Sequence, residues 1–364
     1  MSEKKTDEWL TISEIVASAR AKLPQHLWDH SCAGVEDETT LRRNRSAFEH
    51  IAFRPRALKG VGQNDTSTMF LGHRLALPVM LAPVGTILCY HPDGALACAR
   101  AAERSGTAAF VGMSSSPSLE TVRGNVHGPL FFQIYVRGDR EWLLHLVRRA
   151  EQAGFGGICL TVDNPETGRR ERDLINRFDA HLDLPKPNLA GLPAVSKEAS
   201  QHFKEEFNWE EVAWLRAQTP LPLIIKGILS AEDAELAVKH GVDVVYVSNH
   251  GGRELDHLPA TIDVLPEIVA AVQAKAEVII DSGFMRGTDI VKALALGARA
   301  VLIGKLMTWG LAAGGELGLQ RALELLRLEM RVAMGNIGVR TVAELGPHCV
   351  RPSYPPAQKP WPVN

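Results

Sequence analysis

A histidine, two glycines and an arginine follow directly on a run of apolar residues in the stretch VSNHGGRELD, residues 247–256. His250 comes just after the apolar run ends, and Arg253 follows three residues later. A histidine titrates near neutral pH and can act as a general base, while an arginine can clamp a carboxylate with two parallel hydrogen bonds. The glycines between them allow a sharp turn and leave room for a ligand. The stretch therefore predicts proton transfer beside a site that binds an anion.

Two further charged residues stand at the ends of other apolar runs. Asp163 ends GICLTVD, residues 157–163, and Lys226 comes near the end of PLIIKG, residues 222–227. An aspartate beside a histidine fixes the imidazole tautomer and raises the proton affinity of the ring, as a general base requires. We therefore expect Asp163 to reach His250, with Lys226 beside them.

These residues need a scaffold that brings strand ends together. Short continuous apolar runs recur eight times, as a sheet covered on both faces requires. The runs are residues 78–83, 108–112, 130–136, 157–163, 222–227, 244–249, 278–283 and 300–305. Segments with apolar residues at helical spacing lie between most of them, at residues 95–106, 140–154, 208–218, 230–241, 260–274 and 288–298. Ser230 and Thr288 are the expected N-caps of two of these helices.

Eight strands alternating with helices predict an α/β fold of the (β/α)8 TIM-barrel type, in which the carboxyl ends of the strands carry the chemistry. A doubly wound open sheet is the alternative, and it is disfavoured because no G-x-G-x-x-G follows an early strand. We expect a single domain over residues 1–364, with a helical lead-in over 1–75, the barrel over 76–345 and a Pro-rich tail over 346–364. The tail is either an arm that packs on a neighbouring subunit or a disordered end.

One connection is far longer than the rest. Residues 164–221 separate the fourth run from the fifth, whereas such loops usually take about 2–6 residues outside their helix. In a barrel this insertion sits over the mouth, so it is a candidate lid, and a solvated loop over 180–207 is the alternative. At the opposite end, FRPRAL (53–58) and LGHRLALP (71–78) are expected to be short extended pieces that close the barrel floor.

The last two strand ends predict a phosphate site. DSGFMRGTD, residues 281–289, and IGK, residues 303–305, supply glycines that let backbone N–H groups close on an anion. Loops after strands seven and eight commonly bind phosphate in such barrels. Thr288 and Asp289 are expected to open a helix whose N-terminus favours negative charge, and Lys305 adds a point charge. We therefore expect a phosphorylated cofactor or substrate.

The composition is that of an ordinary soluble protein, with 45% hydrophobic and 23% charged residues. A net charge of −2 and the lack of a basic run argue against nucleic-acid binding. No stretch approaches the roughly 18 apolar residues of a membrane helix, and the N-terminus has no apolar signal region. The five scattered cysteines form no C-x-x-C pair. They predict core residues of a reduced, cytoplasmic protein and neither a disulfide framework nor a metal site.

The sequence resembles the family of FMN-dependent α-hydroxy-acid oxidases and dehydrogenases, which includes glycolate oxidase, lactate oxidase, lactate monooxygenase and mandelate dehydrogenase. SNHGGRELDHLPATIDVLPEI, LTVDNPETGRRERDLINRF and DSGFMRGTDIVKALALGARAVLIGK carry the resemblance, which extends over nearly the whole chain. It implies FMN as the cofactor and oxidation of an L-2-hydroxy acid to the 2-oxo acid, with O2 or a quinone as electron acceptor. It also implies a homo-oligomer, either a tetramer or an octamer.

The resemblance implies a role for each matching residue. His250 would accept the hydroxyl proton, Asp163 would hold its imidazole, and Lys226 would stabilise negative charge on the reduced flavin. The residues that would bind the substrate are Arg253, Arg170, Tyr135 and His30. Those that would line the flavin ring and ribityl chain are Pro83, Val84, Gly85, Ser114, Gln133, Thr161 and Ser248. Those that would hold the phosphate end of FMN are Asp281, Ser282, Gly283, Phe284, Met285, Gly304 and Lys305.

Three residues depart from the family's pattern. His30 stands where the family has a tyrosine that helps to hold the substrate carboxylate, so that contact becomes dependent on pH. Met285 stands where the family usually has an arginine, which removes one phosphate or ribityl contact unless Arg286 replaces it. Gly85 stands where glycolate and lactate oxidases have alanine, which opens space beside the flavin. Two alternatives remain: a tailoring oxidase for a larger hydroxy acid or acyl derivative in a biosynthetic pathway, and a non-redox FMN barrel.

Overall fold

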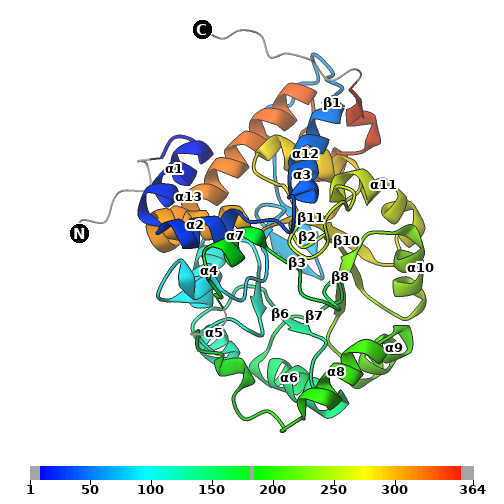
Figure 1. Cartoon of the computed structure of the whole chain (residues 1–364). Helices are drawn as coiled ribbons and strands as arrows, with labels where there is room; N and C mark the ends of the chain where they lie inside the picture. Colours follow the sequence, from blue (N-terminus) through cyan, green and yellow to red (C-terminus); the bar gives the residue numbers. More distant parts are fainter. Residues whose placement is uncertain (1–8, 181–183, 354–364) are drawn as a thin grey trace.

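The computed structural model describes residues 9–180 and 184–353. Eight parallel strands form a closed barrel in which each strand pairs with the next along the chain (Figure 1). The strands are β4 (Val79–Leu81), β5 (Ala109–Gly112), β6 (Leu130–Tyr135), β7 (Ile158–Thr161), β8 (Leu223–Ile228), β9 (Val244–Val247), β10 (Glu277–Ile280) and β11 (Ala300–Ile303). The last strand pairs with the first, with Val301 opposite Val79. The predicted (β/α)8 barrel is therefore confirmed, and the open sheet is excluded.

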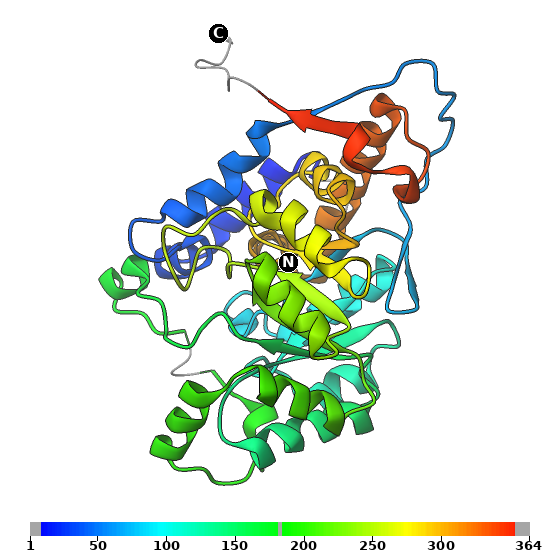
Figure 2. The same ribbon diagram turned by 90° about the vertical axis from the view of Figure 1, so that its right-hand side faces the viewer.

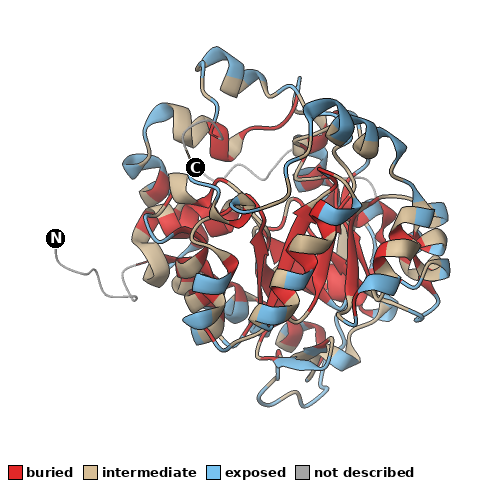
Figure 3. Ribbon diagram, turned by 90° about the horizontal axis from the view of Figure 1, so that it is seen from below, coloured by how far each residue is buried: buried red, intermediate tan, exposed pale blue. Residues whose placement is uncertain are grey.

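Large side chains fill the barrel from inside. The rings of Phe110 and Phe131 lie 5.0 Å apart, and Tyr246 lies 6.0 Å from Phe110. A second apolar layer, between the strands and the surrounding helices, buries alternate residues of the same strands, such as Val111 and Val245. Figure 3 shows the buried residues concentrated in the barrel strands. This burial on both faces explains why the strands read as continuous apolar runs.

Helices surround the barrel (Figure 1). Ser230 caps one of them as predicted, because its Oγ accepts a hydrogen bond from the N–H of Asp233 at 3.2 Å. The prediction for Thr288 is wrong: its helix begins at Gly287, so Thr288 lies inside the first turn. In the described part of the chain, no helix combines the length and the apolar character needed to cross a membrane. The helices are α4 (Gly94–Arg104), α5 (Leu119–Gly124), α6 (Arg140–Ala153), α9 (Trp209–Gln218), α10 (Ala231–Lys239), α11 (Thr261–Val272), α12 (Gly287–Ala295) and α13 (Lys305–Ile337), which bends at Gly314 and Gly315.

A hairpin closes the floor of the barrel. Its strands are β2 (Thr68–Phe70) and β3 (His73–Leu75), and Phe70 and Leu75 are fully buried against the inner barrel residues. The expectation for residues 71–78 is therefore confirmed. The expectation for FRPRAL is wrong, because Phe53 ends β1 (Ile51–Phe53), which pairs antiparallel with β12 (Val350–Pro352) away from the floor.

The first helix of the insertion after β7 lies beside the N-terminal helices. The helices are α1 (Ile12–Lys22), α2 (Gln25–Cys32) and α3 (Thr39–Ser46), and the insertion carries α7 (Glu171–Ile175) and α8 (Lys197–Glu206). Figures 1 and 2 show α7 beside the N-terminal helices. The last helix of the insertion, α9, lies in the barrel ring, where Glu211 pairs with Arg140 of α6. Short 3-10 turns occupy Ala47–His50, Ile87–Cys89, Pro187–Leu189, Val342–Glu344 and Pro347–Cys349.

Candidate active site

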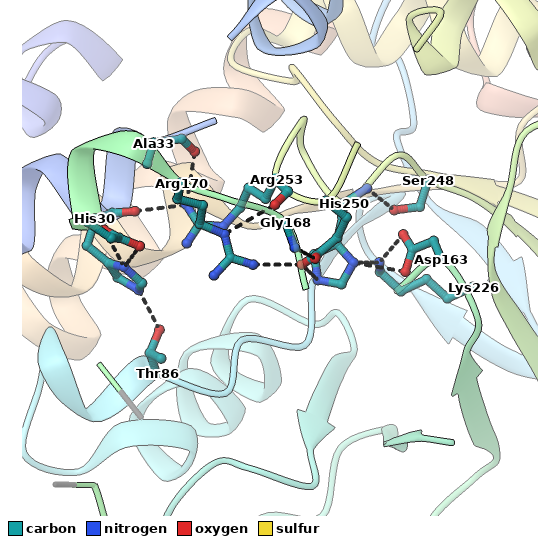
Figure 4. Close-up of polar contacts among 12 residues, drawn as sticks. His30, Ala33, Thr86, Asp163, Gly168, Arg170, Lys226, Ser248, His250 and Arg253 are labelled. Atoms are coloured by element: carbon teal, nitrogen blue, oxygen red, sulfur yellow. Dashed lines mark hydrogen bonds and ion pairs between the residues drawn. The ribbon is translucent and has the colours of Figure 1, made fainter. Parts of the chain in front are cut away.

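Three charged side chains from neighbouring strand ends meet at the mouth of the barrel (Figure 4). Asp163 follows β7, Lys226 lies in β8, and His250 follows β9. The Nδ1 of His250 lies 2.9 Å from Asp163 Oδ1 and 3.3 Å from Lys226 Nζ. An ionised carboxylate can only accept, so the shorter contact, to Asp163, places the proton on Nδ1, and the Lys226 ammonium, which can only donate, makes no hydrogen bond to that protonated nitrogen. This leaves Nε2 of neutral His250 without a proton, as a general base requires.

The electrostatics of this cluster favour an ionised aspartate. Burial alone would raise the pKa of Asp163, but its interactions with His250 and Lys226 lower it to about 2. Burial likewise opposes the charge on Lys226, but the carboxylates of Asp163 and Asp281 raise its pKa above the ordinary value. The aspartate is therefore negative, and the lysine positive, throughout the neutral range.

The backbone turns sharply at His250, as the glycine pair predicted. His250, Gly251 and Gly252 have φ angles of 57°, 69° and 72°, all in the left-handed region. A Cβ on Gly252 would come within 2.7 Å of the backbone nitrogen of Leu41, so only glycine fits there. The Oγ of Ser248 accepts from the N–H of His250 at 3.1 Å and fixes the start of the turn.

After this turn, the side chain of Arg253 contacts the C-terminal end of α2. Its Nη1 donates to the carbonyls of His30 at 2.8 Å and Ala33 at 2.9 Å. Lys305, at the start of α13, donates to the same carbonyl of Ala33 at 3.0 Å. Burial, together with the charge of Arg170, lowers the pKa of Arg253 to about 10. Burial and the charge of Arg253 lower the pKa of Lys305 to about 7.

Arg253 and Lys305 are cations that no carboxylate contacts directly within residues 9–180 and 184–353. In the described part of the chain, both Arg253 and Lys305 donate to backbone carbonyls and not to carboxylates. A buried positive charge without a negative partner costs free energy, so the binding of an anion beside Arg253 or Lys305 is favoured. A Cβ on Gly304 would meet only Ala82, at 3.9 Å, which leaves backbone there open to approach. Lys305 and the first turn of α13 thus fit the phosphate of FMN, and Arg253 fits a carboxylate.

The phosphate loop after β10 differs from the prediction. Amides at the start of α12 are already satisfied by carboxylates: Asp289 accepts from Met285 at 3.1 Å and Arg286 at 3.0 Å, and Glu329 accepts from Gly287 at 2.7 Å. The carboxylates of Asp289 and Glu329 therefore occupy the N-terminus of α12, where the sequence predicted a phosphate. Arg286 does not replace the missing arginine, because its guanidinium pairs with Glu329 at 2.8 Å.

The other predicted residues of this loop have structural contacts. Asp281 accepts from the hydroxyls of Tyr246 and Ser282, each at 2.8 Å. Phe284 turns into the core, where its ring lies 5.0 Å from that of Phe48. A Cβ on Gly283 would come within 2.1 Å of the carbonyl oxygen of Asn44. Met285 is half-buried and packs against the apolar core. These side chains shape the loop, so that any contact with FMN falls to its backbone.

The residues predicted to line the flavin ring lie on adjacent strand ends. Gln133 donates to the hydroxyl of Thr161 at 2.9 Å, and both side chains are buried. The ring of Tyr135 stacks on His250 with centroids 6.4 Å apart. A Cβ on Gly112 would lie 3.2 Å from the amide oxygen of Gln133, which brings β5 and β6 close together. The remaining members follow β4, β5 or β9: Pro83, Val84, Gly85, Ser114 and Ser248.

His30 is placed by a partner that sequence reasoning missed. Its Nδ1 lies 3.0 and 3.1 Å from the two carboxylate oxygens of Asp173, on α7. Its Nε2 lies 3.4 Å from the hydroxyl of Thr86. Burial lowers the pKa of His30 despite the opposing effect of Asp173. The neutral ring therefore donates through Nδ1 and presents Nε2 as an acceptor.

Arg170 also has a partner that the sequence did not reveal. Its Nη2 lies 2.6 Å from Oε1 of Glu254, and its Nε donates to the carbonyl of Arg253 at 3.2 Å. The second oxygen of Glu254 accepts from the N–H of Gly168 at 2.9 Å. The only sequence signal was the acidic residue after Arg253. The predicted substrate-binding arginine is thus held in an ion pair at the edge of the site.

Comparisons with known proteins agree with this geometry. The model of the FMN-dependent dehydrogenase family matches residues 19–352. Glycolate oxidase of Spinacia oleracea is 42% identical over 348 residues, covering 93% of this chain and 94% of that protein. Glycolate oxidase 3 of Arabidopsis thaliana is 41% identical over 348 residues, covering 93% of this chain and 95% of that protein.

Solved structures give the same result. A soluble mutant of the membrane-associated (S)-mandelate dehydrogenase of Pseudomonas putida superposes with a TM-score of 0.90 at 36% identity, covering 95% of this chain and 100% of that one. Mandelate oxidase with (S)-2-phenylpropionate superposes with a TM-score of 0.85 at 39% identity, covering 95% and 98%. The family match spans the barrel, its N-terminal helices and the loops that carry the site. The chain belongs to the FMN-dependent dehydrogenase family and is a flavoprotein oxidoreductase whose cofactor is FMN.

Proposed function

We propose that this chain oxidises an L-2-hydroxy acid to the 2-oxo acid, with His250 as the base. The observation that carries the proposal is the 2.9 Å contact between His250 Nδ1 and Asp163, which directs the unprotonated Nε2 away from the carboxylate. FMN, when bound, supplies a two-electron acceptor. Nε2 of His250 would take the hydroxyl proton as the O–H bond breaks. The α-hydrogen and the two electrons of the C–H bond, released as the C=O bond forms, are what FMN would accept.

Arg253 is the proposed clamp for the substrate carboxylate. Its guanidinium is held by two carbonyls from the N-terminal segment and keeps a positive charge, because even its lowered pKa lies near 10. A planar fork can hold a carboxylate through two hydrogen bonds and fix the α-carbon relative to the base. Tyr135, His30 and Arg170 complete the proposed substrate site. In support, the ring of Tyr135 stacks on His250, the carbonyl of His30 accepts from Arg253, and Arg170 donates to the carbonyl of Arg253.

Lys226 and Lys305 are the proposed cationic contacts to the two ends of FMN. Lys226 is buried beside the base and keeps its charge, which suits stabilisation of negative charge on a reduced flavin. Lys305 gains most from a phosphate, since the carbonyl of Ala33 is its hydrogen-bond acceptor in the described chain. The lining residues on β4 to β7 and Ser248 then contact the flavin ring and ribityl chain, while residues 281–285 and Gly304 enclose the phosphate end.

Anaerobic reduction of the bound flavin by a panel of 2-hydroxy acids tests this function. We expect L enantiomers to bleach the flavin absorbance and the matching 2-oxo acid to accumulate in equal amount. Admission of air then distinguishes an oxidase, which reoxidises rapidly, from an enzyme that needs a quinone. Failure of every hydroxy acid to bleach the flavin of fully loaded protein would reject the proposal in favour of the non-redox barrel.

Larger aryl hydroxy acids are a second substrate class, favoured by the solved neighbours that are named for mandelate. The panel therefore contains mandelate beside glycolate and lactate. One small apolar group in a substrate pocket changes kcat/KM by about tenfold to 200-fold. A kcat/KM for mandelate that exceeds those for glycolate and lactate by about tenfold or more would therefore favour the tailoring oxidase that acts on larger hydroxy acids.

We also propose a cytoplasmic homo-oligomer, either a tetramer or an octamer. All five cysteines are free thiols, which suits a reducing compartment. Leu328 and Val332, one turn apart on α13, are 54% and 57% exposed, and they give an apolar contact for a second subunit. Light scattering should give a mass near four or eight times the 39.8 kDa of one chain. A monomer at micromolar concentration would reject the oligomer.

A further inference from the structure

Glu254 is a buried carboxylate beside the catalytic base, and neither the family resemblance nor the proposed mechanism gives it a role. We propose that Glu254 is a positioning and specificity-determining residue, which holds Arg170 of the insertion in a neutral pair and places a negative charge beside Nε2 of His250. The inference rests on the proposed function, since it concerns the nitrogen that would accept the proton.

The contacts of Glu254 fix its carboxylate in one place. The side chain is only 7% exposed. One oxygen lies 2.6 Å from Arg170 Nη2, and the other accepts from the N–H of Gly168 at 2.9 Å. A buried carboxylate with a charge-assisted hydrogen bond and a backbone donor has little freedom to turn away.

The backbone of the insertion is pressed directly against the catalytic loop at this point. A Cβ on Gly168 would come within 2.4 Å of the carbonyl oxygen of Arg253 and 2.6 Å of that of Glu254. Only glycine allows this approach. The base of the insertion, Glu254 and the turn that carries His250 therefore form one packed unit.

The same carboxylate faces the reactive side of the base. Oε1 of Glu254 lies 3.9 Å from His250 Nε2, while Asp163 holds Nδ1 at 2.9 Å. Two carboxylates thus face the imidazole at its two nitrogens. The titratable and charged groups that face His250 from the surrounding elements are Asp163 after β7, Lys226 in β8, Tyr135 in β6, Glu254 on its own loop and Arg170 in the insertion.

This placement has two opposite consequences for catalysis. A negative charge beside Nε2 stabilises the imidazolium that forms when the hydroxyl proton arrives, which favours turnover. The same charge neutralises Arg170 and repels an anionic substrate, which weakens binding. Glu254 therefore increases the rate of turnover and weakens the binding of the anionic substrate. Because Arg170 is neutralised, Arg253 is the cation that remains to bind the substrate carboxylate.

Glu254→Gln separates these consequences from a purely structural role. The variant keeps the size of the side chain but removes its charge. We expect kcat to fall by about tenfold, while KM for the anionic hydroxy acid falls by about twofold to fivefold. KM for the corresponding uncharged 2-hydroxy amide should not fall. Since the base must be unprotonated, the rise of kcat/KM with pH should move to lower pH by about half to one unit.

Glu38→Gln is the matched control. Glu38 pairs with Arg172 of α7 at 2.5 Å and accepts from the N–H of Gly34 at 3.0 Å, so it also joins the insertion to a neighbouring segment through one arginine and one amide. It does not face His250. We expect this variant to leave the pH profile in place, although it loosens the same insertion.

Glu254→Asp supplies a second variant that retains the charge. Its profile should stay at the wild-type pH even if KM changes, and it serves as the test if the Gln variant does not fold. The inference is overturned if Glu254→Gln raises KM and lowers kcat with an unmoved pH profile, or if the Asp and Gln variants shift the profile equally. Anaerobic flavin reduction in the wild-type protein tests the proposed function separately, so the two failures are distinguishable.

Discussion

The two sides of the barrel mouth handle charge differently. At the ends of β7, β8 and β9, Asp163 faces both Lys226 and His250, at 3.4 and 2.9 Å. Close to α2 and the start of α13, Arg253 and Lys305 instead share the carbonyl of Ala33. On the first side, positive and negative groups of the protein pair with each other. On the second, the two cations contact only backbone carbonyls of the part of the chain that the structure describes, and they are free to pair with bound anions. In the proposed mechanism, the first group of residues performs the chemistry and the second recognises the ligands.

The pKa values express the same contrast. On the paired side, opposite charges overcome burial and hold the pKa of Asp163 at about 2. On the unpaired side, burial and neighbouring positive charge lower the pKa of Lys305 to about 7 and that of Arg253 to about 10. Substitutions on the first side should therefore change rates, and substitutions on the second should change affinities.

The largest effect is expected from His250→Gln, which breaks the paired side at the base. FMN binding should persist, since the phosphate contacts lie elsewhere. The rate of anaerobic flavin reduction should fall by roughly 10²-fold or more, the scale of a positioned acid–base group. Stopped-flow absorbance with saturating substrate measures this rate, and the flavin content of the purified variant is the control.

Asp163→Asn should have an intermediate effect on the same side. The amide keeps a partner near the imidazole but removes the charge that orients it and stabilises its protonated form. We expect a loss of reduction rate of about tenfold or more, smaller than that of His250→Gln. A larger loss of reduction rate in Asp163→Asn than in His250→Gln would show that the aspartate does more than hold the histidine.

Arg253→Lys should act on the unpaired side. Lysine keeps a positive charge but loses the bidentate fork. We expect KM for the hydroxy acid to rise by about tenfold, with a smaller loss of turnover, measured by steady-state kinetics over a range of substrate concentrations. An unchanged KM would remove Arg253 from the substrate site.

The smallest effect concerns the pH dependence of FMN binding through Lys305. Its pKa of about 7 in the free protein should rise when a phosphate binds beside it. Binding then favours the protonated lysine, so FMN affinity is highest below pH 7 and falls as pH rises above it. We expect a loss of about tenfold between pH 7 and pH 9.

Calorimetry in two buffers of different ionisation enthalpy measures the accompanying proton uptake. Lys305→Arg is the matched variant, because a guanidinium stays charged over this range. It should bind FMN without the pH dependence. Equal pH dependence in both proteins would place the titrating group elsewhere.

Features carried by one short segment could be predicted from the sequence. Continuous apolar runs gave the strand positions, and polar residues at their ends placed Asp163, Lys226 and His250 together, because a parallel barrel gathers all its carboxyl ends at one rim. The left-handed turn followed from the two glycines after His250. Each of these inferences depends on local pattern and on the symmetry of the fold.

Features that depend on partners far apart in the sequence could not be predicted. Nothing local pairs Asp173 with His30, or Glu254 with Arg170 across 84 positions. The pairing of β1 with β12 likewise joins residues 51–53 to residues 350–352, so the sequence alone could not show which segment FRPRAL adjoins. The amides of α12 were assigned to a phosphate because their occupation by Asp289 and Glu329 requires side-chain geometry.

The most direct test of the central claim is chemical rescue of His250→Gly. His250 has a φ of 57°, which glycine adopts without strain, so the turn should survive the substitution. The account predicts that the variant binds FMN, reduces it very slowly with an L-2-hydroxy acid, and recovers rate as free imidazole is added, with the recovery following the unprotonated form. Reduction at the parent rate without imidazole would contradict the account, because another group would then be taking the hydroxyl proton.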